Sequence, residues 1–157
     1  MGESWERLEA WPLFTERVHL AVSKTHRFAG NDAIEPKDLA SERLIIRTDC
    51  EMIENFTNFL SAQRVQPKVS HKMVSEQDYL VLLEANLGVG LMPESAVRSN
   101  LACVPVCGLD LSRTVFVYAV AGRQRSLAVS TLIKLLRAGD WSAKIGRYSV
   151  SRGEEAA

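Results

Sequence analysis

Strands and helices alternate in residues 43–92, which read RLIIRTDCEMIENFTNFLSAQRVQPKVSHKMVSEQDYLVLLEANLGVGLM. Residues 44–46 form a short apolar run that predicts a buried strand, and residues 68–74 alternate in polarity as a strand does. Residues 88–93 form a third extended segment, and helical patterns separate the three. This order predicts parallel strands joined by crossover helices, so the sequence indicates an α/β layered fold.

Both crossover helices have a predicted start. Thr48 and Glu51 match the Thr-x-x-Glu capping box, and apolar residues at helical spacing continue to about Arg64. Ser75 is the expected N-cap of the second helix, with Asp78 at the third helical position. Each helix is therefore expected to begin directly after a strand.

The remaining elements lie outside this stretch. We expect strands at 17–23 and 103–106, one helical turn at 36–40 and a short helix at 93–98. Residues 114–120 are apolar on both faces, which predicts a central strand. Ser126 is expected to cap a last helix that stops at Gly139, and residues 142–157 are expected to form a loose tail.

Two loops at the carboxyl ends of the strands are candidate binding sites. Ligands of open α/β sheets bind at such ends, near helix N-termini, where backbone N–H groups attract anions. The first loop is Arg47, Thr48, Asp49 and Cys50, and the second contains Ser75, Glu76 and Gln77. An arginine at this place suits a carboxylate ligand, whereas the alternative is that both loops only cap helices.

Composition limits the function further. The chain has 157 residues with 19 basic and 19 acidic side chains, so its formal net charge is zero and no basic surface for unspecific nucleic-acid binding is expected. No apolar run approaches the length of a membrane span, and the N-terminus does not resemble a signal peptide. We therefore expect a cytoplasmic protein.

The cysteines and histidines do not predict a metal or cofactor site. Three cysteines are too few for a disulfide framework, and Cys103 and Cys107 lack a second ligand pair at zinc spacing, so we expect buried thiols. His19, His26 and His71 are far apart in sequence and lack paired acidic ligands. For His26, near a turn, we expect a structural role. No cofactor is expected.

Several stretches resemble the effector-binding domain of LysR-type transcriptional regulators. The resemblance spans roughly residues 11–141 and is strongest at the glycine-rich segment Leu87-Gly88-Val89-Gly90-Leu91-Met92-Pro93. The other matching stretches follow in the family's order: Pro12-Leu13-Phe14-Thr15-Glu16, the strand to Val22, His26, Asp38-Leu39-Ala40, Leu44-Ile45-Ile46-Arg47, Cys50-Glu51, 113–120 and the last helix.

The resemblance implies the fold of type 2 periplasmic binding proteins, in which two α/β subdomains enclose a small effector in a cleft. By resemblance, residues 33–104 form one complete subdomain. Residues 1–32 contain a crossover strand and a remnant of the other subdomain, and residues 105–141 contain the return crossover and its C-terminal helix. The family's DNA-binding domain has no counterpart in this sequence, so we expect an N-terminally truncated regulator that does not bind DNA itself.

The implied function is effector sensing in transcription regulation. The expected ligand is a small organic anion, contacted by the two loops and by Met92 and Pro93 at the end of the glycine-rich strand. The expected partners are further copies of the chain or a full-length regulator of the family. No association with a membrane is expected. The alternatives are a remnant that only mediates oligomerisation and, less favoured, a small enzyme using Asp49 and Glu76 as acid and base.

Cys50 has a separate functional alternative. A thiol at a helix N-terminus is activated by the helix dipole, and the peroxide-sensing branch of the family uses a cysteine in this region. That branch also has a partner cysteine later in the same helix. Residues 52–64 contain none. Redox sensing is therefore the less favoured interpretation of Cys50.

Overall fold

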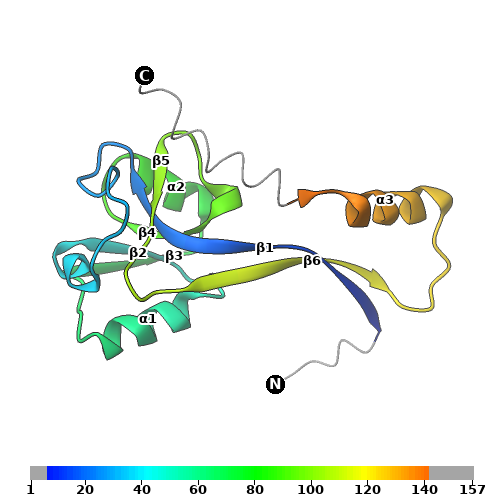
Figure 1. Ribbon diagram of the computed structural model, residues 1–157, viewed down its shortest axis with the longest axis horizontal. Helices are drawn as coiled ribbons and strands as arrows, with labels where there is room; N and C mark the ends of the chain where they lie inside the picture. Colours follow the sequence, from blue (N-terminus) through cyan, green and yellow to red (C-terminus); the bar gives the residue numbers. More distant parts are fainter. Residues whose placement is uncertain (1–6, 142–157) are drawn as a thin grey trace. The chain divides into compact units, whose positions relative to one another are not determined.

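The computed structural model of the protein describes residues 7–141, which form two compact units. The larger unit is Arg17–Ser112, and the smaller unit combines the described parts of Met1–Glu16 and Arg113–Ala157. The chain passes between the units within two long strands, β1 (Leu8–Ser23) and β6 (Leu111–Val120) (Figure 1). β1 is much longer than the strand that alternation predicted at 17–23.

The strands of the larger unit have two arrangements. The second half of β1 lies between β4 (Gly90–Pro93) and β5 (Leu101–Val104) and is antiparallel to both. β2 (Arg43–Arg47) and β3 (Val69–Met73) are parallel, as predicted. A parallel bridge from Leu44 to Val89 connects β2 to the segment that enters β4.

Two helices cover opposite faces of β2. Leu44 and Ile46 belong to a buried cluster with Phe56 and Leu60 of α1 (Ile53–Ala62). Ile45 points the other way and belongs to a second buried cluster, whose members on α2 (Glu76–Glu84) are Tyr79, Leu80 and Leu83. Because successive side chains of a strand alternate between faces, a short apolar run can bury both of its sides. The α/β prediction for residues 43–92 is confirmed (Figure 1).

The two predicted helix starts have different outcomes. Ser75 caps α2, since its hydroxyl oxygen accepts a hydrogen bond from the Asp78 amide at 3.2 Å. The prediction of a Thr48–Glu51 capping box is wrong. α1 begins at Ile53, after the N-cap Met52, and the Met52 side chain makes no capping hydrogen bond. The Thr48 hydroxyl instead donates to the Met73 carbonyl at 3.4 Å, on the neighbouring strand.

The short elements follow the sequence prediction with shifted bounds. Short 3-10 helices occur at Pro36–Ser41 (η1) and Glu94–Ala96 (η2). α1 ends at Ala62 rather than Arg64. β5 ends at Val104, and Val106, predicted to lie in this strand, makes an isolated parallel bridge to Ile34.

The smaller unit is built on a two-stranded ribbon. The first half of β1 pairs with β6, which the ribbon diagram shows running alongside it (Figure 1). Glu16 is buried here and accepts a hydrogen bond from Arg113 Nε at 2.8 Å. The prediction of a central strand at 114–120 is wrong, since among the described strands β6 pairs with β1 only. Its side chains alternate between half-buried and exposed, so one of its faces is more exposed than the other.

α3 (Leu127–Ala138) completes the described chain. As predicted, Ser126 caps it by accepting from the Val129 amide at 3.3 Å, and Gly139 is its C-cap. None of its residues is buried, although it is strongly amphipathic. The predicted tail at 142–157 lies outside the described residues. No helix within residues 7–141 has the length and apolarity that a bilayer crossing requires.

Candidate functional site

The carboxyl ends of three parallel segments meet at one edge of the larger unit. Arg47, the last residue of β2, is the register partner of Met73, the last residue of β3. The parallel bridge from Leu44 to Val89 brings β4 level with them on the other side of β2. This edge has the polarity at which ligands of parallel sheets bind.

The turn after β2 contains the first group of predicted site residues. The Thr48 amide donates to the Met73 carbonyl at 3.0 Å, which fastens the turn to the end of β3. Arg47 Nε lies 2.8 Å from Asp49 Oδ1, and the Cys50 amide donates to the Arg47 carbonyl at 3.1 Å. Since α1 starts only at Ile53, these four residues form a turn and not the first turn of the helix.

The start of α2 contains the second group of predicted site residues, Ser75, Glu76 and Gln77. This group lies next to the turn after β2. Arg47 Nη1 lies 3.3 Å from Glu76 Oε2, so one guanidinium bridges the two loops. The oxygen of Ser75 is occupied by its capping bond, and Gln77 Oε1 accepts from Arg98 at 3.4 Å. The amides of Glu76 and Gln77 lie in the first helical turn, where no intrahelical acceptor is available.

Tyr79 lies behind this edge. Its hydroxyl donates to the Leu91 carbonyl at 2.7 Å and its side chain is buried. Burial raises the pKa of Tyr79 well above its usual value, the nearby Cys50 raises it further, and Arg47 opposes the shift. From the sequence, Tyr79 was expected only as part of an apolar helix face, and its place beside Cys50 and Arg47 was not predicted.

Gly90 is the sequence signal that points to Tyr79. A Cβ atom at position 90 would collide with the Tyr79 hydroxyl and would lie 2.7 Å from the Ile45 carbonyl oxygen. Only glycine leaves room for a tyrosine between α2 and β4. The glycine-rich segment therefore provides space for packing.

Met92 and Pro93 occupy the end of β4 beside this edge. They are the register partners of His19 and Val18 on β1. The Met92 side chain is buried in the same cluster as Tyr79, whereas Pro93 is half-buried. Of these two predicted residues, Pro93 is thus the one with exposed surface.

The chemistry of the edge is that of one arginine shared by two carboxylates. The side chains of Asp49 and Glu76 are 63% and 65% exposed, against 27% for Arg47. Exposed carboxylates are readily displaced from an arginine because such surface ion pairs contribute little free energy. The arrangement can therefore exchange an internal carboxylate for that of a ligand.

The described residues offer no alternative metal chemistry. Within 7–141 no group of three or more His, Cys, Asp or Glu side chains is placed to hold a metal ion. All three cysteines are thiols: Cys50 and Cys103 are half-buried and Cys107 is exposed. The prediction of a buried thiol is therefore wrong for Cys107. Its pKa is raised, first by a hydrogen bond to Glu35.

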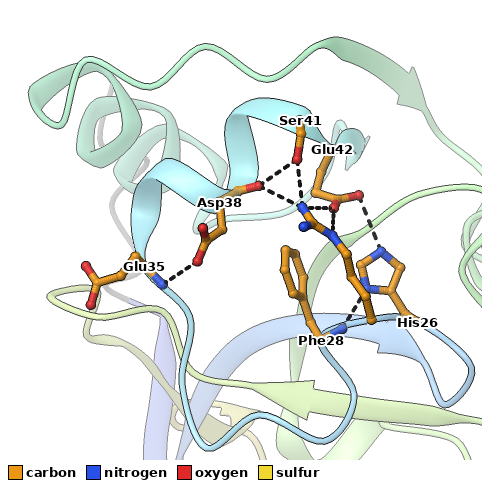
Figure 2. A network of polar contacts seen from close by, with 7 residues as sticks. His26, Phe28, Glu35, Asp38, Ser41 and Glu42 are labelled. Carbon is orange, nitrogen blue, oxygen red and sulfur yellow. Dashed lines mark hydrogen bonds and ion pairs between the residues drawn. The ribbon is translucent and has the colours of Figure 1, made fainter.

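A second polar network lies elsewhere in the larger unit (Figure 2). Glu42 accepts from His26 Nε2 at 3.3 Å and from Arg27 Nε at 2.9 Å, and Arg27 also donates to Ser41 at 2.7 Å. His26 Nδ1 accepts from the Phe28 amide at 3.2 Å. Because the contacts of His26 are internal, this network fastens the turn after β1 to η1, which confirms the structural role expected for His26.

Comparison with known proteins agrees with this fold. The family model of the LysR substrate binding domain matches residues 1–141. The HTH-type transcriptional regulator MetR of Escherichia coli (strain K12) is 27% identical over 132 residues, which cover 80% of this chain and 41% of MetR. The chain thus spans about two fifths of the length of the curated relatives it matches.

Solved structures share the architecture at low identity. The CcmR regulatory domain of Synechocystis PCC6803 in complex with 2-PG aligns with a TM-score of 0.67 at 19% identity, covering 88% of this chain and 69% of that domain. The effector binding domain of QuiR in complex with shikimate gives 0.64 at 18% identity, covering 87% and 66%. The BenM effector binding domain with benzoate gives 0.60 at 22%, covering 93% and 68%.

These neighbours have the type 2 periplasmic-binding-protein-like fold, which confirms the predicted fold class. The family match covers all the described residues, from β1 to α3. On this match, the chain belongs to the LysR substrate-binding domain family.

Proposed function

We propose that this chain is the effector-sensing portion of a LysR-type transcriptional regulator and that it binds a small organic anion at the edge beside Arg47. The observation that carries the proposal is the position of Arg47. Its guanidinium lies at the carboxyl end of β2 and contacts both Asp49 and Glu76. A ligand carboxylate would replace these contacts, since arginine pairs with a carboxylate through two parallel N–H···O bonds.

Further groups at the edge favour an anion. The start of α2 offers the amides of Glu76 and Gln77 and the positive end of a helix dipole. Thr48 is fastened to β3 beside them. We infer that Arg47, Thr48 and the start of α2 provide the main contacts, with Asp49, Cys50, Ser75, Glu76, Gln77, Met92 and Pro93 surrounding them.

The chemistry of the neighbours' ligands supports the same class. QuiR and BenM are described with shikimate and with benzoate, and both molecules are carboxylates. At identities of 18% and 22% these structures indicate the fold of this chain but not its ligand. The proposal of an organic anion therefore rests on Arg47, and the neighbours supply the compounds to test.

The remaining functional proposals follow from the family. We propose a non-enzymatic protein, because Asp49 and Glu76 contact one guanidinium and are not arranged as an acid and a base around an open position. Three thiols without a disulfide suit a cytoplasmic location. The proposed partners are further copies of the chain or a full-length regulator, and we propose no direct contact with nucleic acid or membrane.

Thermal unfolding with added carboxylates tests the anion site. A ligand that binds only the native chain at a hundredfold excess over its Kd adds about 2.7 kcal/mol of stability. We expect benzoate, shikimate or a related carboxylate to raise the Tm of the full chain, and Arg47→Ala to abolish that rise.

Arg43→Ala is the matched control, because Arg43 is exposed at the other end of the same strand. It should leave the ligand-dependent rise unchanged. A rise that persists in Arg47→Ala would place the ligand elsewhere. The absence of a rise with every carboxylate would refute anion binding.

A further inference from the structure

The charges at the edge beside Arg47 are unequal. Arg47 Nε lies 2.8 Å from Asp49 Oδ1, and Arg47 Nη1 lies 3.3 Å from Glu76 Oε2, so two carboxylates share one guanidinium. Arg98 contacts the same helix, but it pairs with another carboxylate, that of Glu84, at 3.8 Å. The cluster of Arg47, Asp49 and Glu76 therefore holds one excess negative charge.

Both carboxylates stay close to any ligand that binds Arg47. Asp49 lies in a short turn that backbone hydrogen bonds fasten: the Thr48 amide donates to the end of β3 at 3.0 Å, and the Cys50 amide donates to the Arg47 carbonyl at 3.1 Å. Glu76 is the first residue of α2. A ligand carboxylate that replaces their contacts with Arg47 therefore lies only a few Å from both displaced carboxylates.

This arrangement disfavours a plain monocarboxylate. Repulsion from a like charge about 4 Å away in bulk water weakens binding about fivefold, and it is stronger where water is partly excluded. Both displaced carboxylates repel the ligand in this way, because an ionised carboxylate has acceptors and no donor. A ligand that brings its own donor replaces this repulsion by hydrogen bonds.

We infer that Asp49 and Glu76 determine the specificity of this site: they select a carboxylate that carries an O–H or N–H donor on the neighbouring carbon, as a hydroxy acid or an amino acid does. Both side chains are well exposed and can accept from a ligand whose carboxylate Arg47 holds. A hydroxyl offers one donor, whereas an ammonium offers three donors and keeps the excess at one negative charge. This selection rests on the proposed anion site at Arg47.

Propionate, L-lactate and L-alanine test the selection, because they share one carbon skeleton and differ only in the group on the carbon next to the carboxylate. Titration of the full chain at pH 7, followed by NMR of its backbone amides, gives the Kd of each compound, weak binding included. We expect lactate to bind more tightly than propionate, and alanine to bind about tenfold more tightly than propionate. Arg47→Ala should weaken the binding of all three.

Two amide variants separate charge selection from a structural role. Asp49→Asn and Glu76→Gln each remove one negative charge and keep the size of the side chain. Each should tighten propionate binding about fivefold and weaken alanine binding by a similar factor, whereas a change that only disturbed Arg47 would weaken both. Glu54→Gln is the matched control, because Glu54 is exposed on α1 and loses the same charge. Far-UV circular dichroism and Tm verify that the variants fold.

The outcomes distinguish this selection from the anion site itself. Equal affinities for the three compounds would overturn the selection, and so would amide variants that shift propionate and alanine in the same direction. Binding of benzoate that depends on Arg47, without binding of any of the three, would also overturn it but would leave the anion site standing. If no carboxylate binds, or if Arg47→Ala leaves binding unchanged, the anion site itself is refuted.

Discussion

Replacing Tyr79 by phenylalanine removes one buried hydroxyl and its hydrogen bond to the Leu91 carbonyl, 2.7 Å long. The ring remains, so the apolar packing of the second cluster is kept. Loss of one buried hydrogen bond that leaves a carbonyl acceptor behind costs about 1–2 kcal/mol. We therefore expect the free energy of unfolding at pH 7 to fall by that amount in Tyr79→Phe.

The same substitution should change the pH dependence of stability. Burial raises the pKa of Tyr79 in the folded chain, whereas an unfolded tyrosine titrates near its usual value of about 10. The unfolded chain thus releases this proton first. Stability is fully present below about pH 10 and falls by about 1.4 kcal/mol per pH unit above it. The phenylalanine variant lacks this loss, so the two stability curves should converge above pH 10.

Urea unfolding followed by far-UV circular dichroism measures both effects at pH 7, 9, 10 and 11. Other groups titrate equally in both chains, so the difference between the curves isolates Tyr79. Ser70→Ala is the control, because Ser70 is exposed on β3 and the loss of its hydroxyl should alter stability by less than about 0.5 kcal/mol. A difference between wild type and Tyr79→Phe that stays constant from pH 7 to 11 would refute the reasoning.

Two further predictions concern other positions. Gly90→Ala should lower the free energy of unfolding in urea by about 1–3 kcal/mol, because the new Cβ would lie 2.7 Å from the Ile45 carbonyl oxygen. Gly30→Ala is the control, since a Cβ at position 30 would meet no atom within 4 Å. Equal losses in the two variants would contradict the packing role of Gly90. Glu35→Gln should speed the alkylation of Cys107 at pH 8, since the Glu35 hydrogen bond raises the pKa of that thiol. The rate is measured by mass spectrometry of the Cys107 peptide, and an unchanged rate would contradict this effect of Glu35.

The helix caps show which features were local. Ser75 and Ser126 cap their helices through bonds to amides three residues ahead, and such contacts are complete within one turn of chain. The Thr48–Glu51 pattern had the same form, but its prediction was wrong. The Thr48 hydroxyl donates its hydrogen bond to the Met73 carbonyl on the adjacent strand instead. A partner 25 residues away cannot be read from a four-residue pattern.

The candidate site was predictable in position but not in its contacts. The strand–helix order located Arg47 and Ser75 after two strands, because parallel strands end at one edge. That Arg47 contacts both Asp49 and Glu76, and that Tyr79 lies behind them, depends on how α2 packs on β2. The effector contacts themselves stay a prediction.

The sequence by itself determined the element order and the parallel pairing of β2 with β3, since periodicity and short spacings carry that information. Its motifs, in their order along the chain, resembled the family that the comparison shows. Only the tertiary structure decided the neighbours of β6. An apolar strand such as 114–120 looks central from its composition, but a strand is central only where the chain supplies a partner on each side. The described residues supply β1 alone, and Phe116, Tyr118 and Val120, which helped to predict a central strand, are exposed, whereas Val115 and Val117 are half-buried.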